Sequence, residues 1–379
     1  MARIVHLANF FGPRSGGLRT TMLRLAEGYR AAGHEVHLVV PSQPGGWRQP
    51  TNARVHTLSS VGIPRSGGYR LVLSPARIRQ VLDSIRPDVI ELSDRLTLMS
   101  AARWARRHHV PCTLFAHERV DGVFAEHAPH LPGESIADRM NTRIAQQVDR
   151  IVTTTRYAAE EFHRVGIGTH HVPLGVDSQR FRPAPSLPTP TGSRIDLVMC
   201  SRLSREKHPQ QAIAVVAEAV RRGYPWHLTI VGDGPLMAEL RYQAVGLPVT
   251  FTGFLPSPDA VATQLQKAHA VLAPGPIETF GLAALESLAC GTPVVCNQKS
   301  ALPEVVGDAG VAVGADPREW VEAVEIITGP RSPEIRRRAR ARALSMSWDR
   351  TITRMLSLHH LMASAEREGD YAVREREAA

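Results

Sequence analysis

Two glutamates, Glu278 and Glu286, lie eight residues apart around the start of an apolar helix that is expected after a Pro/Gly loop. The first backbone N–H groups of this helix, at Phe280, Gly281 and Leu282, and the positive end of its dipole would face an anion. Ionised glutamates only accept hydrogen bonds, so beside an anion they suit hydroxyl groups. The spacing favours a ligand that carries both phosphates and sugar hydroxyls, as a nucleotide sugar does. The alternative is a core helix with Glu278 in solvent.

A second candidate phosphate loop, residues 12–20, directly follows the first expected strand and opens a helix. Its paired glycines, Gly16 and Gly17, allow the backbone to approach a phosphate closely. No Gly-Lys-Ser/Thr follows, so the segment is not a Walker loop. A plain tight turn is the alternative explanation of the same residues.

Arg202 and Lys207 share one loop, after the first expected strand of the second half of the chain and before a helix. Both cations could reach one diphosphate and stabilise the negative charge that grows on a departing nucleoside diphosphate. A divalent metal does this elsewhere, but the chain has no Asp-x-Asp pair, so we expect no metal ion and no other cofactor. Lysine is rare in this arginine-rich chain, which draws attention to Lys207. The alternative is a solvated surface lysine.

Glycine turns follow two further expected strands of the second half. Gly232-Asp-Gly234-Pro ends one strand, and the backbone near Phe254 after the next could face a purine, although a simple turn fits equally well. The third glycine of a dinucleotide fingerprint and its acidic partner are missing, which argues against a NAD-dependent oxidoreductase. His117 ends a buried strand of the first half, where an acceptor would lie; such a histidine is often only a core or rim residue. The other histidines lack metal-ligand spacing.

The net charge of +9 and the isoelectric point near 9.9 call for an acidic partner, such as nucleic acid, anionic lipid or a nucleotide. A basic helical run carries Arg103, Trp104, Arg106 and Arg107, which could hold the protein on anionic lipid headgroups; a solvated helix face is the alternative. Nucleic acid is not expected, because aromatic residues are not interleaved with the basic runs. No apolar run reaches the roughly 18–20 residues of a membrane-spanning helix, and no signal peptide is found. We therefore expect a cytoplasmic protein, peripheral on the inner face of the cell membrane.

Short apolar runs alternate with amphipathic stretches along the 379 residues, as expected for an α/β protein with two doubly wound domains. Strands are expected at residues 4–7, 36–40, 89–92, 113–116 and 151–154, and then at 195–199, 226–231, 249–251, 270–273 and 294–295. A Pro-rich segment without periodicity separates the two sets. We predict a first domain over residues 1–176, a linker over 177–192, a second domain over 193–347 and a C-terminal helix over 348–370.

Together these motifs resemble the retaining glycosyltransferases of family four. The resemblance rests on Glu278-x7-Glu286, Ser201-Arg202-Leu203 with Lys207, Val231-Gly-Asp-Gly-Pro235 and Pro293-Val-Val. It implies the GT-B fold, in which two Rossmann-like domains face a central cleft and a C-terminal helix crosses back to the N-terminal domain. Residues 7–20 and 273–282 look like those of the actinobacterial GDP-mannose-dependent α-mannosyltransferases that build glycolipids. Two departures are Glu278-Thr-Phe-Gly in place of Glu-x-Phe/Pro-Phe-Gly, and Ser300-Ala-Leu302 in place of Gly-Gly before Pro303-Glu304.

The resemblance implies a role for each candidate residue. The donor diphosphate would be held by Gly16, Gly17, Arg202 and Lys207, the sugar hydroxyls by Glu278, the ribose by Glu286, and the base by the backbone near Phe254. His117 would lie near the reacting carbon and bond the sugar 6-hydroxyl. Since no nucleophile is left on the reacting face, we expect front-face transfer of a hexose with retention.

Several alternatives remain open at the level of sequence. The donor is expected to be GDP-mannose and the acceptor a glycolipid, but a UDP-sugar-dependent glycosyltransferase with a soluble acceptor such as a polyol would carry the same motifs. A GT-B nucleotide-sugar epimerase is a further alternative within enzymes. A basic peripheral-membrane or nucleic-acid-binding protein with a degenerate sugar site is disfavoured, because Arg202, Lys207, Glu278 and Glu286 are all present.

Overall fold

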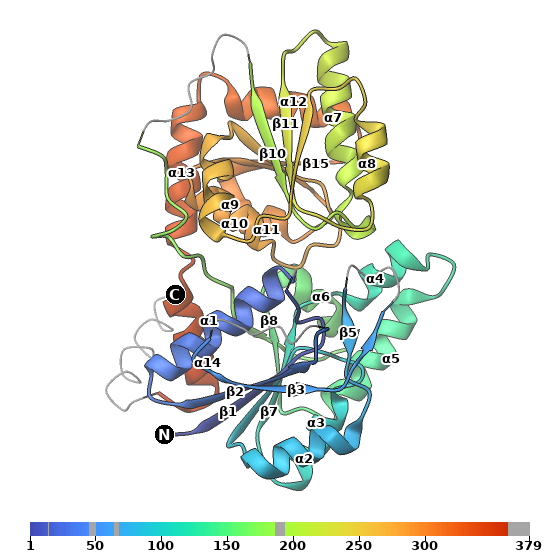
Figure 1. The fold of residues 1–379 in the computed structure, drawn as a ribbon, viewed down its shortest axis with the longest axis vertical. Helices are drawn as coiled ribbons and strands as arrows, with labels where there is room; N and C mark the ends of the chain where they lie inside the picture. The colour runs from blue at the N-terminus through green and yellow to red at the C-terminus, as the bar shows by residue number, and fades with distance from the viewer. Residues whose placement is uncertain (14, 45–50, 64–67, 186–193, 363–379) are drawn as a thin grey trace.

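The computed structural model describes residues 1–13, 15–44, 51–63, 68–185 and 194–362. Two α/β domains are stacked on one another, with the N-terminal domain below and the C-terminal domain above in Figure 1. Part of the predicted linker (186–192) and the end of the predicted C-terminal helix (363–370) lie outside the described residues, as does Arg14 in the first glycine loop.

The N-terminal domain contains a seven-stranded parallel sheet of order β3-β2-β1-β6-β7-β8-β9. Its strands are β1 (Arg3–Leu7), β2 (Glu35–Pro41), β3 (Arg54–Leu58), β6 (Val89–Leu92), β7 (Cys112–Ala116), β8 (Arg150–Thr153) and β9 (His170–His171). An antiparallel pair is formed by β4 (Val61–Gly62) and β5 (Arg70–Leu71). The helices are α1 (Gly17–Ala31), α2 (Pro75–Ile85), α3 (Met99–Arg107), α4 (Val120–His127), α5 (Gly133–Ala145) and α6 (Arg156–His163).

The C-terminal domain repeats this plan with a six-stranded parallel sheet of order β12-β11-β10-β13-β14-β15. Its strands are β10 (Asp196–Cys200), β11 (His227–Val231), β12 (Val249–Gly253), β13 (Ala270–Ala273), β14 (Val294–Asn297) and β15 (Gly310–Val313). The helices are α7 (Pro209–Arg221), α8 (Met237–Gln243), α9 (Pro258–Lys267), α10 (Leu282–Ala289), α11 (Leu302–Val306), α12 (Pro317–Thr328), α13 (Ser332–Leu344) and α14 (Trp348–Leu358), with short 3₁₀ turns η1 (Arg205–Lys207) and η2 (Gly307–Ala309).

The apolar runs of the sequence form the central strands, because helices cover both faces of a parallel sheet and bury every side chain. All four residues of β6 and all five of β7 are buried. Each strand expected from the sequence overlaps a strand of the structure, with ends that shift by one or two residues. The chemistry-bearing loops follow the central strands of the two sheets, at the edges that face each other between the domains.

The last described helix, α14, returns to the N-terminal domain and packs beside α1 (Figure 1). Gly28 of α1 makes room for it, since a β-carbon there would lie 2.3 Å from Cδ1 of Ile352. At the crossing point a β-carbon on Gly175 would lie 2.1 Å from the backbone nitrogen of Trp348. The crossing helix expected from the sequence is therefore present from Trp348 to Leu358.

Candidate active site

The loop between β13 and α10 is held against the N-terminal domain by hydrogen bonds of Thr279. Its hydroxyl donates to the backbone oxygen of His117 at 2.6 Å. The hydroxyls of Thr154 and Thr155 donate to the backbone oxygen of Thr279 at 3.1 and 2.8 Å. Glu278 is therefore brought to the same side of the cleft as His117, although the two residues are 161 positions apart in the sequence.

The starts of α1 and α10 face each other across the cleft. A β-carbon on Gly17 would lie 3.6 Å from Leu282, the first residue of α10. Neither helix has a side-chain cap at Gly16 or Gly281, so their first N–H groups remain available to an anion. Gly281 has a φ of 82°, and a β-carbon there would lie 2.3 Å from Leu302, which explains why this position is glycine.

The helix starts two residues later than the sequence suggested at Phe280. The aromatic side chain of Phe280 is buried, and its backbone belongs to the loop before the Gly281 cap. The first helical N–H groups are therefore those of Leu282 and Ala283, and Phe280 is a packing residue at the edge of the candidate anion site.

Lys207 and Glu278 form an ion pair across two loops of the C-terminal domain. Their strands, β10 and β13, are neighbours in the sheet, which explains how residues 71 positions apart meet. Both side chains are about a quarter exposed, at 26% and 25%. Burial alone would lower the pKa of Lys207, but the Glu278 carboxylate raises it, so the lysine is held positively charged.

Arg202 lies in the same loop and contacts the N-terminal domain. Its guanidinium pairs with Glu206, donates to the Ser204 hydroxyl at 3.0 Å, and lies 4.5 Å from the ring centre of Tyr69. The ring of Tyr69 in turn meets Phe10 edge-on at 5.1 Å. Tyr69 has no motif around it, so the sequence reasoning missed that an aromatic ring of the other domain orients this arginine.

His117 follows β7 and belongs to a chain of buried polar side chains behind the cleft. Its Nε2 lies 2.9 Å from the Ser93 hydroxyl, which lies 2.7 Å from Nε2 of His6. The Nδ1 of His6 lies 3.0 Å from Glu91. Burial is the main cause that lowers the pKa of His117 to about 3, so its imidazole is neutral at physiological pH.

Glu91 lies at the far end of this series of hydrogen-bonded side chains and is completely buried. Tyr29 donates to it at 2.6 Å, and His359 at the end of α14 lies 2.7 Å away. Burial alone would raise the pKa of Glu91, but the hydrogen bonds from His359 and His6 hold it well below its usual range. One buried carboxylate therefore joins the crossing helix α14 to the strand that carries His6.

The polar chain favours one tautomer of His117. When the ring proton of His6 lies on Nδ1, which faces the Glu91 carboxylate, its Nε2 accepts from the Ser93 hydroxyl. The Ser93 oxygen accepts from Nε2–H of His117, which leaves Nδ1 of His117 as a hydrogen-bond acceptor. A sugar hydroxyl is a donor that suits this nitrogen. The one sequence signal for these buried polar side chains was a glutamate inside the apolar strand 89–92, since a buried charge requires partners.

Glu286 lies one turn into α10 and is partly buried. Burial raises the pKa of its carboxyl to about 8, so the side chain is largely protonated at neutral pH. A ligand that donates hydroxyl hydrogen bonds would favour the ionised form.

The remaining predicted donor residues lie at the ends of β11 and β12. Gly232 has a φ of 140°, and a β-carbon there would lie 1.9 Å from the backbone oxygen of Ser201. The glycine thus lets the β11 loop pack on the loop that carries Arg202. Phe254 follows β12 and is 43% exposed. These loops and the Lys207–Glu278 pair lie at the same edge of the sheet.

The expected membrane-facing helix is corrected in one respect. Arg103, Arg106 and Arg107 are exposed, but Trp104 is only 5% exposed and its Nε1 donates to Asp83 at 2.7 Å. The expectation that Trp104 faces a membrane is therefore wrong. The helical repeat places Trp104 one turn after Ala101, on the face of α3 that packs into the domain. Its arginine neighbours suggested an exposed position instead.

Two kinds of feature are absent from the described parts of the chain. No group of three or more His, Cys, Asp or Glu side chains is placed there to hold a metal ion. None of the helices in these ranges has the length and hydropathy needed to cross a lipid bilayer.

Comparison with known proteins agrees with the fold and the loops. Residues 16–175 match the family model of the glycosyl transferase 4-like domain, and residues 194–328 match that of the glycosyl transferases group 1. The chain is 44% identical over 378 residues to the GDP-mannose-dependent alpha-(1-6)-phosphatidylinositol dimannoside mannosyltransferase of Mycobacterium tuberculosis, which covers 97% of this chain and 98% of that relative. The chain is a family-four glycosyltransferase.

More distant relatives of this glycosyltransferase share its architecture. A GDP-mannose-dependent alpha-mannosyltransferase of Mycolicibacterium smegmatis is 28% identical over 77% of this chain and 79% of its own length. Sucrose-phosphate synthase from Thermosynechococcus elongatus superimposes with a TM-score of 0.82 at 18% identity, covering 95% of this chain and 98% of its own. Anabaena HepE in complex with UDP and glucose gives a TM-score of 0.75 at 17% identity, covering 94% and 100%. The expected GT-B fold is confirmed, and the enzyme transfers hexoses.

Proposed function

We propose that this glycosyltransferase transfers mannose from GDP-mannose, with retention, to a mannosylated phosphatidylinositol lipid at a membrane surface. The observation that carries the choice of donor and acceptor is the 44% identity, over nearly the full length of both chains, to the mycobacterial enzyme of that activity. The facing starts of α1 and α10 beside Lys207 and Arg202 support a diphosphate donor.

In this proposal the donor diphosphate lies between the N–H groups that follow Gly16 and Gly281. Lys207 and Arg202 stabilise the charge that develops on the leaving phosphate, and no metal ion is required. Glu278 accepts hydrogen bonds from the sugar hydroxyls while it keeps Lys207 charged. Glu286 binds the ribose and the backbone near Phe254 meets the base.

His117 positions the mannosyl group by accepting a hydrogen bond from a sugar hydroxyl at Nδ1. The acceptor hydroxyl attacks the anomeric carbon from the face that the phosphate leaves. The carbon–phosphate oxygen bond breaks as the new glycosidic bond forms, and the hydroxyl proton passes to the departing phosphate oxygen. Both donor-site glutamates are assigned to hydroxyl groups, so neither is free to attack the sugar. A covalent glycosyl–enzyme adduct on any carboxylate would contradict this step.

The lipid acceptor places the reaction at a membrane surface, and the exposed Arg103, Arg106 and Arg107 would supply electrostatic attraction to anionic headgroups at about 1 kcal/mol each. Because Trp104 is buried, this peripheral association would be electrostatic, without an inserted aromatic side chain.

Calorimetric binding of GDP, UDP and ADP tests the donor assignment. We expect GDP to bind more tightly than UDP or ADP, and the affinity to be the same with excess Mg²⁺ as with a chelator. GDP-mannose should likewise bind more tightly than UDP-glucose. Tighter binding of UDP would contradict the mannose assignment, and a requirement for Mg²⁺ would contradict the metal-free site.

Donor binding should also release a proton from Glu286. Before donor binds, the raised pKa of about 8 keeps this carboxyl largely protonated at pH 7, whereas hydrogen bonds from the ribose hydroxyls favour the ionised form. Affinity for GDP is therefore expected to rise with pH by up to about tenfold per unit below pH 8 and to level off above it. Calorimetry at pH 7 in buffers of different ionisation enthalpy measures the proton directly. The control is Glu286→Gln, which should lose the buffer dependence; equal buffer dependence in both proteins would exclude Glu286 as its source.

A further inference from the structure

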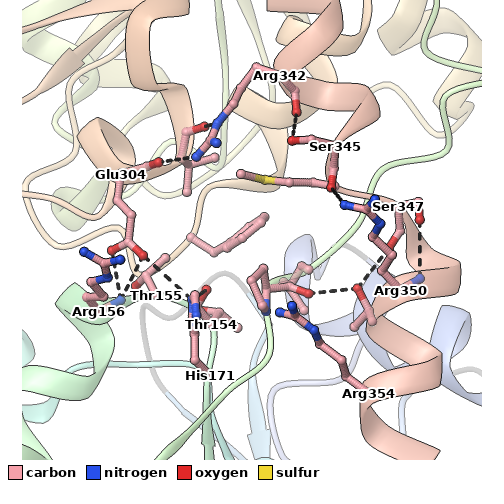
Figure 2. A pocket seen from close by; sticks show the side chains of 16 residues that line it. Thr154, Thr155, Arg156, His171, Glu304, Arg342, Ser345, Ser347, Arg350 and Arg354 are labelled. Carbon is pink, nitrogen blue, oxygen red and sulfur yellow. Dashed lines mark hydrogen bonds and ion pairs between the residues drawn. The ribbon is translucent and has the colours of Figure 1, made fainter. Parts of the chain in front are cut away.

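A pocket of about 400 Å³ lies between the two domains, where the chain passes from α13 into the crossing helix α14 (Figure 2). Its walls come from the start of α6 and the end of β9 in the N-terminal domain, from α11 in the C-terminal domain, from the end of α13 and from the first two turns of α14. Phe280 also lines it, so the pocket adjoins the loop that carries Glu278 without sharing Lys207, Arg202 or Glu286. We call it the hinge pocket.

The hinge pocket is lined by four arginines, Arg156, Arg342, Arg350 and Arg354, and by one carboxylate, Glu304. They come from α6, α11, α13 and α14 and lie around the hollow in Figure 2. This excess of positive charge is the feature that distinguishes it from an ordinary gap between domains.

The carboxylate of Glu304 is already engaged at the start of α6. It accepts the backbone N–H of Arg156 at 2.8 Å and that of Tyr157 at 3.4 Å, and Nε2 of His171 lies 3.7 Å away. A helix N-terminus stabilises a carboxylate in this position. The negative charge of Glu304 is therefore directed at α6, and among the described residues Arg156, Arg342 and Arg350 are left without a carboxylate that pairs with their guanidinium groups.

Arg342 of α13 and Arg350 of α14 are held in place by neutral groups. Arg342 donates to the backbone oxygens of Glu304 and Val305 at 2.7 and 3.0 Å, and Arg350 donates to that of Ser345 at 2.9 Å. Within the described residues, neither of them nor Arg156 forms an ion pair with a carboxylate. Carbonyl oxygens fix the direction of these guanidinium groups without cancelling their charge.

Several like charges fixed around one hollow repel one another, and a bound anion would relieve that repulsion. Guanidinium groups match phosphate oxygens through paired N–H donors. The volume falls in the usual range for small-ligand sites. We propose that the hinge pocket binds a phosphate ester, separately from the donor diphosphate. A ligand there touches both domains and the crossing helix α14, so it stabilises the domain arrangement described here and the position of the Phe280 loop.

Phosphate binding to matched variants tests this assignment. Inorganic phosphate is titrated by calorimetry at constant ionic strength into the full-length protein, into R350Q/R354Q, and into R156Q, whose guanidinium can be removed with little risk to folding because it is exposed. We expect both variants to weaken phosphate binding, by at least tenfold for the double change. R338Q is the control, since Arg338 is an exposed residue of α13 that pairs with Glu334 at 2.9 Å.

The donor site could also bind phosphate, so the titration is repeated with Lys207→Ala. Phosphate binding at the hinge pocket should be retained in Lys207→Ala, and the affinity for GDP should be retained in R350Q/R354Q. Unchanged phosphate affinity in both hinge variants, or loss of all binding in Lys207→Ala, would overturn the proposal. These outcomes do not depend on which nucleotide the donor site prefers.

Vesicles then identify the source of the phosphate ester. Phosphatidylinositol vesicles that displace bound phosphate, where phosphatidylcholine vesicles do not, support a lipid headgroup; displacement by glycerol 3-phosphate alone supports a soluble ester. Failure of both to displace phosphate would contradict a phosphate-ester site.

Discussion

Replacing Lys207 with alanine raises the activation free energy of glycosyl transfer by about 2–4 kcal/mol, which is roughly 30- to 900-fold in kcat. This prediction rests on an ammonium group that the structure holds against Glu278 and keeps charged within the cleft. Preorganised charge of this kind stabilises the departing phosphate without reorganisation during the reaction. The measurement is kcat with the donor at saturating concentration, because removal of the lysine also weakens donor binding.

The matched control for this variant is Lys267→Ala, which removes an exposed lysine at the end of α9. Its kcat should stay within twofold of the unmodified enzyme. A variant in which only Glu278 becomes glutamine separates the loss of the ion pair from the loss of the positive charge. An unchanged rate in Lys207→Ala would remove this residue from the mechanism.

Replacing Glu91 with alanine destabilises the folded protein by about 3–5 kcal/mol, the range for removing one partner of a buried charged pair. The change leaves the donors of Tyr29, His6 and His359 without their acceptor in a site that water does not reach. Urea unfolding at pH 7 measures the loss. The control is Glu27→Ala on α1, whose carboxylate is 71% exposed and which should change stability by less than about 0.5 kcal/mol.

The stability contributed by Glu91 also has a defined pH dependence. Its folded pKa lies below the unfolded value, so its contribution is fully present at neutral pH and is lost progressively as the pH falls below roughly 4, toward the folded pKa. The difference in stability between the unmodified protein and Glu91→Ala should therefore narrow on acidification. A difference of the same size at pH 7 and pH 3 would contradict the role of the ionised carboxylate.

The sequence predicted the two sheets because the central strands are apolar on both faces and the loops between them carry glycine and proline. It also identified Lys207 and Glu278, whose meeting follows from the adjacency of β10 and β13 in a doubly wound sheet. Contacts between the two domains were not predictable in the same way. Tyr69, Thr279 and Glu304 make such contacts from segments without periodicity, and nothing in the spacing of residues specifies how two separate sheets face each other.

The local sequence pattern was least informative for two residues, Trp104 and Glu91, and both proved to be buried. Trp104 lies among arginines, which suggested an exposed face, yet the helical repeat directs it into the core of the N-terminal domain. Glu91 lies inside an apolar strand, where a charge requires partners, and those partners come from β1, α1 and the distant end of α14. The second case shows that a polar residue in a buried strand deserves a search for its neighbours even without a motif.

Transfer of radiolabelled mannose from GDP-mannose to lipid tests the central claim most directly. The enzyme is incubated with a chelator and vesicles that contain phosphatidylinositol dimannoside, and UDP-glucose serves as the competing donor. We predict that label enters the lipid fraction from GDP-mannose, that the new linkage has the α configuration of the donor, and that Lys207→Ala reduces the rate while Lys267→Ala does not. Transfer from UDP-glucose but not from GDP-mannose, or a product of inverted configuration, would contradict the account.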